Sequence, residues 1–290
     1  MSIKAVPRVS PKKIAAFREA VWDYYKAHGR QDLPWRKTSD PYRILVSEVM
    51  LQQTQVSRVI EKYKEFLIRF PNARRLAEAP LSDVLRAWSG LGYNRRAKYL
   101  KAAAEVIVRG YGGRVPKASI VLRTIPGIGP YTASAVRVFA FNEPDVLIET
   151  NVRAAFIHYF FGDTSILSGR PKLMGVTDKQ LLPFIENAAE CQDPRTWQWA
   201  LMDYGVYIKK LHGNPARRSA HYTRQSKFEG SLRQVRGEIL RQLMKGNNGL
   251  KGMLPRPGLG NEREKWEKAL AGLAKDGLIR KEKGRWMMIV

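Results

Sequence analysis

The chain of 290 residues is predicted to be mainly α-helical and to end in a small α+β domain. Three observations favour this fold. Apolar residues recur at helical spacing through the first 225 residues, in stretches that prolines separate. No stretch alternates strictly between apolar and polar residues before residue 278, which argues against a sheet-based fold there. Apolar residues make up 44% of the sequence, enough to bury a real core and to exclude a wholly disordered chain.

The first predicted helix covers residues 11–28, where Ile14, Phe17 and Val21 fall on one face. Residues 32–36, with the sequence DLPWR, are expected to form a turn.

A second helical region is expected from residue 39 to residue 70. Ser39 or Asp40 can cap it, and Pro41 suits a first turn because that position needs no N–H donor. Shorter helices should follow, separated by Pro71, Pro80, Pro116, Pro126 and Pro144.

The segment 205–228 carries six basic residues and no acidic residue, and it is predicted to be a basic loop or linker. A helix at 232–245, a Gly/Pro-rich turn at 250–260 and a helix at 261–277 should follow. The chain then offers two short strands about Lys283-Gly284. This order resembles a winged helix, a variant of the helix-turn-helix. A small α+β oligomerisation or docking domain is the alternative.

The net charge of +25, from 51 basic and 26 acidic residues, points to an anionic partner. Nucleic acid is favoured over an anionic membrane surface or an acidic protein; a merely solvated basic surface is the remaining reading. No stretch is apolar enough for a membrane span, and the N-terminus lacks a secretory h-region. The single cysteine, Cys191, excludes a disulfide framework and any site that needs several thiolates. A cytoplasmic or nucleoid-associated, intracellular location is expected.

The sharpest local motif is LRTIPGIGPYTASAV at 122–136. Gly127 and Gly129 permit a tight turn between two helices, after which backbone N–H groups at a helix N-terminus can hold a DNA phosphate. A plain connecting turn is the alternative.

Five motifs occur in an order that resembles one family. They are DLPWR (32–36), SEVMLQQTQV (47–56), GLGYNRRAKYL (90–100), PGIGPYT (126–132) and ETNVR (149–153). Together they resemble the helix-hairpin-helix DNA glycosylases of the MutY type, which remove adenine from A/G mismatches. The resemblance covers residues 31–224. It implies a glycosylase core at 1–224, followed by the winged-helix-like domain at 225–290.

Within that core, the resemblance implies two helical subdomains with the active site in the cleft between them. Residues 38–144 would form one subdomain, and residues 1–37 with 145–224 the other. Double-stranded DNA with a mismatch or lesion would be the partner of a monomeric protein.

The family's chemistry assigns three catalytic positions. Hydrolysis of an N-glycosidic bond needs a proton for the departing base and negative charge beside the cationic sugar. Glu48 matches the catalytic glutamate. Glu149 stands where most members have an aspartate that stabilises or captures the sugar. Tyr131 occupies the position of the nucleophilic lysine of bifunctional relatives, so strand cleavage through a Schiff base is not expected. Glu48 could instead be an ordinary helix glutamate, Glu149 could mark a degenerate site, and Tyr131 could be a core tyrosine.

Further positions match residues that handle the flipped base or the DNA. Gln53 matches a wedge residue and Tyr93 an intercalating one. The lesion-pocket positions are Trp35, Arg36 and Leu51, although Trp35 could belong to the core. Arg95, Arg96 and Lys98 could contact the DNA backbone or form a solvated helix face. Lys209 and Lys210 begin a basic stretch, 209–227, that is expected to dock on DNA.

Three departures from the family pattern limit how far the family's properties can be expected of this chain. Lys209 replaces the first of four cysteines that hold a 4Fe–4S cluster, so no cluster and no cofactor are expected. The sequence leaves open whether the 125–130 hairpin binds a monovalent cation, as related hairpins do. Trp199 stands where a Glu or Gln contacts the flipped adenine. The family's C-terminal domain, which inspects 8-oxoguanine, is larger than 229–290.

These features predict a monofunctional DNA glycosylase, with adenine opposite guanine or 8-oxoguanine as the family default. A glycosylase for another base, such as uracil or thymine opposite guanine, is the second hypothesis. The third is a DNA-binding protein without catalysis on the same scaffold.

Overall fold

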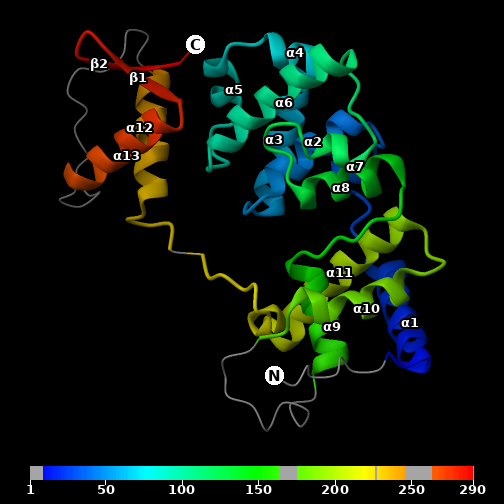
Figure 1. Cartoon of the computed structure of the whole chain (residues 1–290). Helices are drawn as coiled ribbons and strands as arrows, with labels where there is room; N and C mark the ends of the chain where they lie inside the picture. The colour runs from blue at the N-terminus through cyan, green and yellow to red at the C-terminus, as the bar shows by residue number, and fades with distance from the viewer. Residues whose placement is uncertain (1–8, 163–174, 226, 246–262, 290) are drawn as a thin grey trace, which may run out of the picture. The chain divides into compact units, whose positions relative to one another are not determined.

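The protein is described by a computed structural model over residues 9–162, 175–225, 227–245 and 263–289. The predicted mainly helical fold with a small C-terminal β-hairpin is confirmed (Figure 1). Contacts divide the chain into two units. Unit 1 comprises residues 1–37 and 134–224, and unit 2 comprises residues 38–133 and 225–290.

The described part of unit 1 is a bundle of helices with two short 3₁₀ turns. Its elements are α1 (Pro11–His28), η1 (Pro34–Arg36), the greater part of α8 (Pro130–Phe141), α9 (Thr150–Phe161), α10 (Asp178–Ala189), α11 (Pro194–His212) and η3 (Pro215–Arg218).

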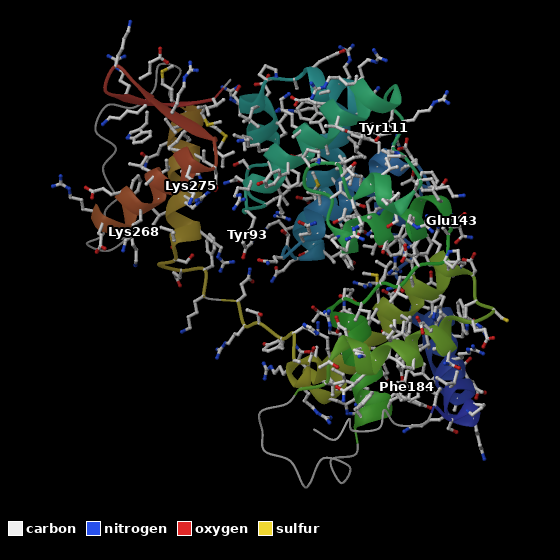
Figure 2. The ribbon with its side chains drawn as sticks, in the orientation of Figure 1. Tyr93, Tyr111, Glu143, Phe184, Lys268 and Lys275 are labelled. Carbon is white, nitrogen blue, oxygen red and sulfur yellow. The ribbon has the colours of Figure 1, made fainter. Side chains whose placement is uncertain are left out.

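Aromatic side chains fill the core of unit 1. Phe17 of α1 is fully buried, and its ring centroid lies 4.7 Å from that of Phe156 on α9 and 6.4 Å from that of Trp197 on α11. Phe184 of α10, labelled in Figure 2, packs 4.8 Å from Phe160 between ring centroids. The predicted helix 11–28 is confirmed, with Phe17 on its buried face.

Unit 2 combines a group of helices with the C-terminal segment. Its elements are α2 (Pro41–Leu51), α3 (Val56–Arg69), α4 (Ala73–Glu78), α5 (Leu81–Ala87), α6 (Arg95–Tyr111), α7 (Ser119–Leu122), the start of α8, α12 (Leu232–Lys245), α13 (Arg263–Lys275), β1 (Ile279–Glu282) and β2 (Arg285–Met288).

The C-terminal part has the predicted order of two helices and a hairpin. Strands β1 and β2 pair antiparallel, with Glu282 opposite Arg285, and the turn residues Lys283 and Gly284 both have positive φ. Trp266 of α13 is buried, as is Ile239 of α12. The Gly/Pro-rich turn expected at 250–260 lies outside the described residues.

The structure corrects the sequence analysis at two boundaries. The region 39–70 forms two helices, because Gln53 adopts a positive φ of 54° between them. The expected loop 205–228 begins as helix, since α11 continues to His212 and ends where Gly213 has a φ of 72°.

The subdomain boundary expected at residue 144 stays a prediction. The boundary between the two contact units falls between Ala133 and Ser134, inside α8. The reason is that the second half of α8 packs within unit 1, where Phe139 stacks on Trp199 with ring centroids 6.1 Å apart.

In the described part of the chain, no helix is long and apolar enough to cross a membrane.

Candidate functional site

Glu48 is a buried carboxylic acid in the middle of an apolar helix. Asp40 caps α2 by accepting hydrogen bonds from the N–H groups of Tyr42 and Arg43, and Pro41 occupies the first turn, as the sequence predicted. Residues 44–50 are all buried, and Glu48 is the charged residue among them, with 6% of its surface exposed. A carboxyl group at this position is chemically able to donate a proton.

The α7–α8 hairpin of PGIGPYT depends on one glycine for its shape. Gly127 has a φ of 78°, and a Cβ there would lie 2.6 Å from the Cβ of Tyr99. Gly129 is exposed, and a Cβ at this position would meet nothing within 4 Å. Packing therefore explains Gly127 but not Gly129, whose lack of a side chain leaves the start of α8 open to a phosphate. Tyr131 follows in the first turn of α8 and is half-buried.

Arg96 is a clamp for the end of α2. Its Nη1 donates to the carbonyl oxygens of Val49, Met50 and Gln52, at 2.7, 3.0 and 2.5 Å, and its Nη2 donates to the hydroxyl of Thr54 at 3.0 Å. Burial lowers the pKa of this guanidinium to about 10. These bonds hold the turn that carries Gln53. The sequence analysis did not predict this role for Arg96. Arg95 is exposed and lies 3.4 Å from Asp276.

Gln53 and Tyr93, the predicted insertion residues, occupy turns with left-handed backbone, at φ of 54° and 48°. Gln225 donates to the Tyr93 hydroxyl and to Gln53 Oε1. Arg233 of α12 donates to the same hydroxyl at 2.5 Å, and its Cζ lies 5.3 Å from the Tyr93 ring centroid. These residues of unit 2 line a cavity of about 440 Å³. The sequence marked Gln53 and Tyr93 by their motifs, but gave no signal that Gln225 and Arg233 meet them.

The predicted base-pocket residues fall in both units. Leu51 ends α2 in unit 2, whereas Trp35, Arg36 and Trp199 belong to unit 1. Trp35 is 6% exposed, and Trp199 is half-buried. The Arg36 guanidinium lies 5.5 Å from the Trp199 ring centroid.

A buried ion pair fixes Arg36. Its Nη1 and Nη2 donate to the two oxygens of Asp203 at 2.7 and 2.9 Å, and Arg30 Nε donates to the same carboxylate at 2.7 Å. Burial raises the pKa of Asp203, but the hydrogen bonds and charges of Arg36 and Arg30 outweigh it, so the pKa lies below its ordinary value. Arg36 therefore holds η1 against α11. The sequence analysis did not single out Asp203, the α11 residue that fixes Arg36.

Glu149 caps α9 with one carboxylate oxygen and binds the Asn151 side chain with the other. Oε1 accepts from the N–H groups of Asn151 and Val152 at 2.7 and 2.9 Å, and Oε2 accepts from Asn151 Nδ2 at 3.1 Å. Burial raises the pKa of Glu149, against the hydrogen bonds from Asn151 and Val152 and the charge of Lys209. Lys209 Nζ donates to Asn151 Oδ1 at 3.0 Å, while the side chain of Lys210 is exposed.

The residues present do not fit the iron–sulfur cluster that the resemblance brings to mind. Cys191, the one cysteine of the chain, is exposed and precedes α11. The position of the family's first cysteine holds an ammonium bound to Asn151. Within the described ranges, no three His, Cys, Asp or Glu side chains gather as metal ligands.

A family model described as "HhH-GPD superfamily base excision DNA repair protein" matches residues 46–186. The chain is 35% identical over 251 residues to an adenine DNA glycosylase of Mycobacterium tuberculosis strain H37Rv, covering 79% of this chain and 78% of that protein. It is 34% identical over 199 residues to an adenine DNA glycosylase of Buchnera aphidicola, covering 69% of this chain and 54% of that protein. The match thus spans about half the length of the Buchnera relative.

Other relatives bear different names. A thymine/uracil-DNA glycosylase of Pyrobaculum aerophilum is 38% identical over 137 residues, covering 47% of this chain and 60% of that one. The solved structure of a thermostable thymine-DNA glycosylase aligns with a TM-score of 0.60 and 28% identity, over 70% of this chain and 91% of that one. The chain belongs to the HhH-GPD superfamily of base excision DNA repair proteins.

Proposed function

We propose that the protein is a monofunctional DNA glycosylase of base excision repair. It flips a mispaired or damaged base from double-stranded DNA and hydrolyses the N-glycosidic bond of that nucleotide. The observation that carries this proposal is Glu48, a carboxylic acid buried in the apolar helix α2 within the segment that the superfamily model matches.

Each carboxyl group would have one role in base release. Glu48 gives its proton to the departing base as the bond to the sugar C1′ breaks. The Glu149 carboxylate stabilises the positive sugar or captures it. Water finally adds at C1′ and gives its proton to the Glu48 carboxylate. Because Tyr131 has no amine, no Schiff base forms at this position, and the product is an abasic site in an unbroken strand.

DNA would be held through its backbone and at the extruded nucleotide. The open Gly129 turn at the start of α8 accepts a phosphate, and Gln53 and Tyr93 fill the space that the flipped base leaves. The net charge of +25 supports binding to a polyanion. We propose a monomer that carries no iron–sulfur cluster, since a single cysteine cannot hold one.

Adenine opposite guanine or 8-oxoguanine is the leading substrate, supported by the names of the mycobacterial and Buchnera relatives. Thymine or uracil opposite guanine is the second candidate. It is favoured by Trp199, which stacks on Phe139 at a position where a polar side chain would read adenine. The Pyrobaculum relative named for thymine and uracil supports the same reading.

The test is a panel of duplexes that each carry one mismatch or lesion, incubated with excess protein and then treated with alkali to cleave abasic sites. We expect release of one base class. Glu48→Gln should abolish release while DNA affinity stays within a few-fold, because an amide cannot donate the proton. Glu61→Gln, at an exposed position of α3, is the matched control and should remain active. Binding of DNA without release from any duplex would instead support the non-catalytic hypothesis, and full activity of Glu48→Gln would reject the mechanism.

A further inference from the structure

The side chain of Asn151 bridges Glu149 to helix α11. Its Nδ2 donates to Glu149 Oε2 at 3.1 Å, and its Oδ1 accepts from Lys209 Nζ at 3.0 Å. An ammonium group has only donors, so it can bind only the oxygen of a carboxamide. Lys209 thereby decides which way the Asn151 amide faces, and this leaves the NH₂ group for the carboxylate.

The approach of α11 to this bridge is built into the helix. A Cβ on Gly205 would lie 2.1 Å from the carbonyl oxygen of Asn151, so only glycine lets the two backbones come this close. Lys209 lies four residues after Gly205, on the same face of α11. The glycine brings the helices together, and the lysine one turn later reaches the Asn151 side chain.

We propose that Lys209 is a positioning residue for Glu149, acting through the Asn151 carboxamide to hold the carboxyl group in one orientation and to favour its ionised form. This inference rests on the proposed function, because the sugar cation that Glu149 would face belongs to that reaction. Lys209 thus has a role at the active-site carboxylate, beyond the DNA docking expected from its place in a basic stretch.

Several other charged groups of α9 and of the elements packed against it bind partners other than Glu149. Arg153 on α9 donates to both oxygens of Asp178 on α10, at 2.8 and 2.7 Å. Arg218 of η3 donates to the carbonyl of Phe161 at the far end of α9. On α11, Arg195 donates to the carbonyl of Ala140, and Asp203 is bound by Arg30 and Arg36. The other titratable groups with described contacts are the stacked pair His158 and His212, and Tyr159, Tyr204 and Tyr207, which pack on aromatic rings.

Lys209 therefore supplies the charge that opposes the protonation of Glu149. Burial raises the pKa of this carboxyl, and the backbone hydrogen bonds and the Lys209 charge act against the rise. A carboxylate is ionised above its pKa, so loss of the lysine charge should move the protonation of Glu149 to higher pH.

The experiment measures the titration of Glu149 itself in the whole chain. Glutamate side-chain carboxyls are labelled with carbon-13, and the Glu149 signal is assigned by its loss in Glu149→Gln. In Lys209→Met we expect the pKa of Glu149 to rise by about one unit. Lys209→Arg should restore most of the difference. Lys26→Met is the control, because it removes one lysine of unit 1 whose side chain is 74% exposed on α1.

A further variant separates hydrogen bonding from charge. Lys209→Gln keeps a donor for Asn151 without the positive charge, so it should raise the pKa of Glu149 while retaining a single conformation of the Asn151 amide. It also keeps the test possible if the methionine variant does not fold. The acidic limb of single-turnover base release against pH should move in the same direction in both variants.

The outcomes separate the two proposals. An unchanged pKa of Glu149 in folded Lys209→Met or Lys209→Gln overturns the positioning role, whatever the activity. An equal shift in Lys26→Met also overturns it, because the effect would then follow net charge alone. Absence of base release by the wild-type protein from every duplex overturns the proposed function, whereas the titration still decides whether Lys209 controls Glu149.

Discussion

Replacing Gly205 by alanine should destabilise the protein, although alanine is the better helix former. The added Cβ would lie 2.1 Å from the carbonyl oxygen of Asn151, and that oxygen belongs to the main chain of α9. The two helices must separate by roughly 1 Å or more to reach normal contact. Overpacking of this kind costs up to about 3 kcal/mol. The higher helix propensity of alanine offsets about 0.5–1 kcal/mol of this cost. The expected net loss is about 2 kcal/mol.

The assay is urea unfolding followed by circular dichroism, with the midpoint and slope compared between variants. Gly110→Ala in α6 is the matched control, because a Cβ there would meet nothing within 4 Å. It should stabilise the protein slightly, by about 0.5–1 kcal/mol. If Gly205→Ala is as stable as the wild type, α9 and α11 do not approach as closely as the structure indicates, and the reasoning about Asn151 and Lys209 loses its geometric basis.

Three further predictions concern charge and chemistry. Asp203→Asn should lower the free energy of unfolding at pH 7 by about 3 kcal/mol, because it leaves the buried Arg36 without its counter-charge. Folding lowers the pKa of Asp203, so the stabilisation by its carboxylate is fully present above the unfolded-state pKa. The difference in unfolding free energy between wild type and variant should therefore shrink as the pH falls through the folded-state pKa. Borohydride should trap no covalent complex of the wild type with DNA, whereas Tyr131→Lys should give weak trapping; strong trapping of the wild type would show that another lysine is the nucleophile. Changing the exposed hairpin residues Lys281, Lys283 and Arg285 to glutamine should flatten the slope of log affinity against log salt by up to roughly three units, and an unchanged slope would mean that these charges are merely solvated.

The local patterns of the sequence were sufficient to predict helices and strands and some of the residues at which they begin or end. The helical spacing of Ile14, Phe17 and Val21 predicted α1, and Asp40 with Pro41 predicted the start of α2, since caps and periodicity act within a few residues. The turn at Lys283-Gly284 predicted the terminal hairpin for the same reason.

Other features depend on pairs of residues that are far apart in the chain. Arg36 and Asp203 are separated by 167 positions, and their hydrogen bond holds Arg36, a predicted pocket residue, in a buried ion pair. Arg96 reaches back 47 residues to Val49, and this clamp accompanies the break of the region 39–70 into two helices. No periodicity in either segment carries that information.

The sequence by itself determined the helical fold, the C-terminal hairpin and the family motifs, because each of them depends on residues that are neighbours in the chain. Only the tertiary structure decided what Lys209 does. Its surroundings in sequence are basic and predicted a loop, but Ile208 is buried in the core of unit 1, and α11 therefore stays helical to His212. The helix carries the lysine to Asn151, 58 positions away, because Gly205 lets two backbones meet where any other side chain would collide.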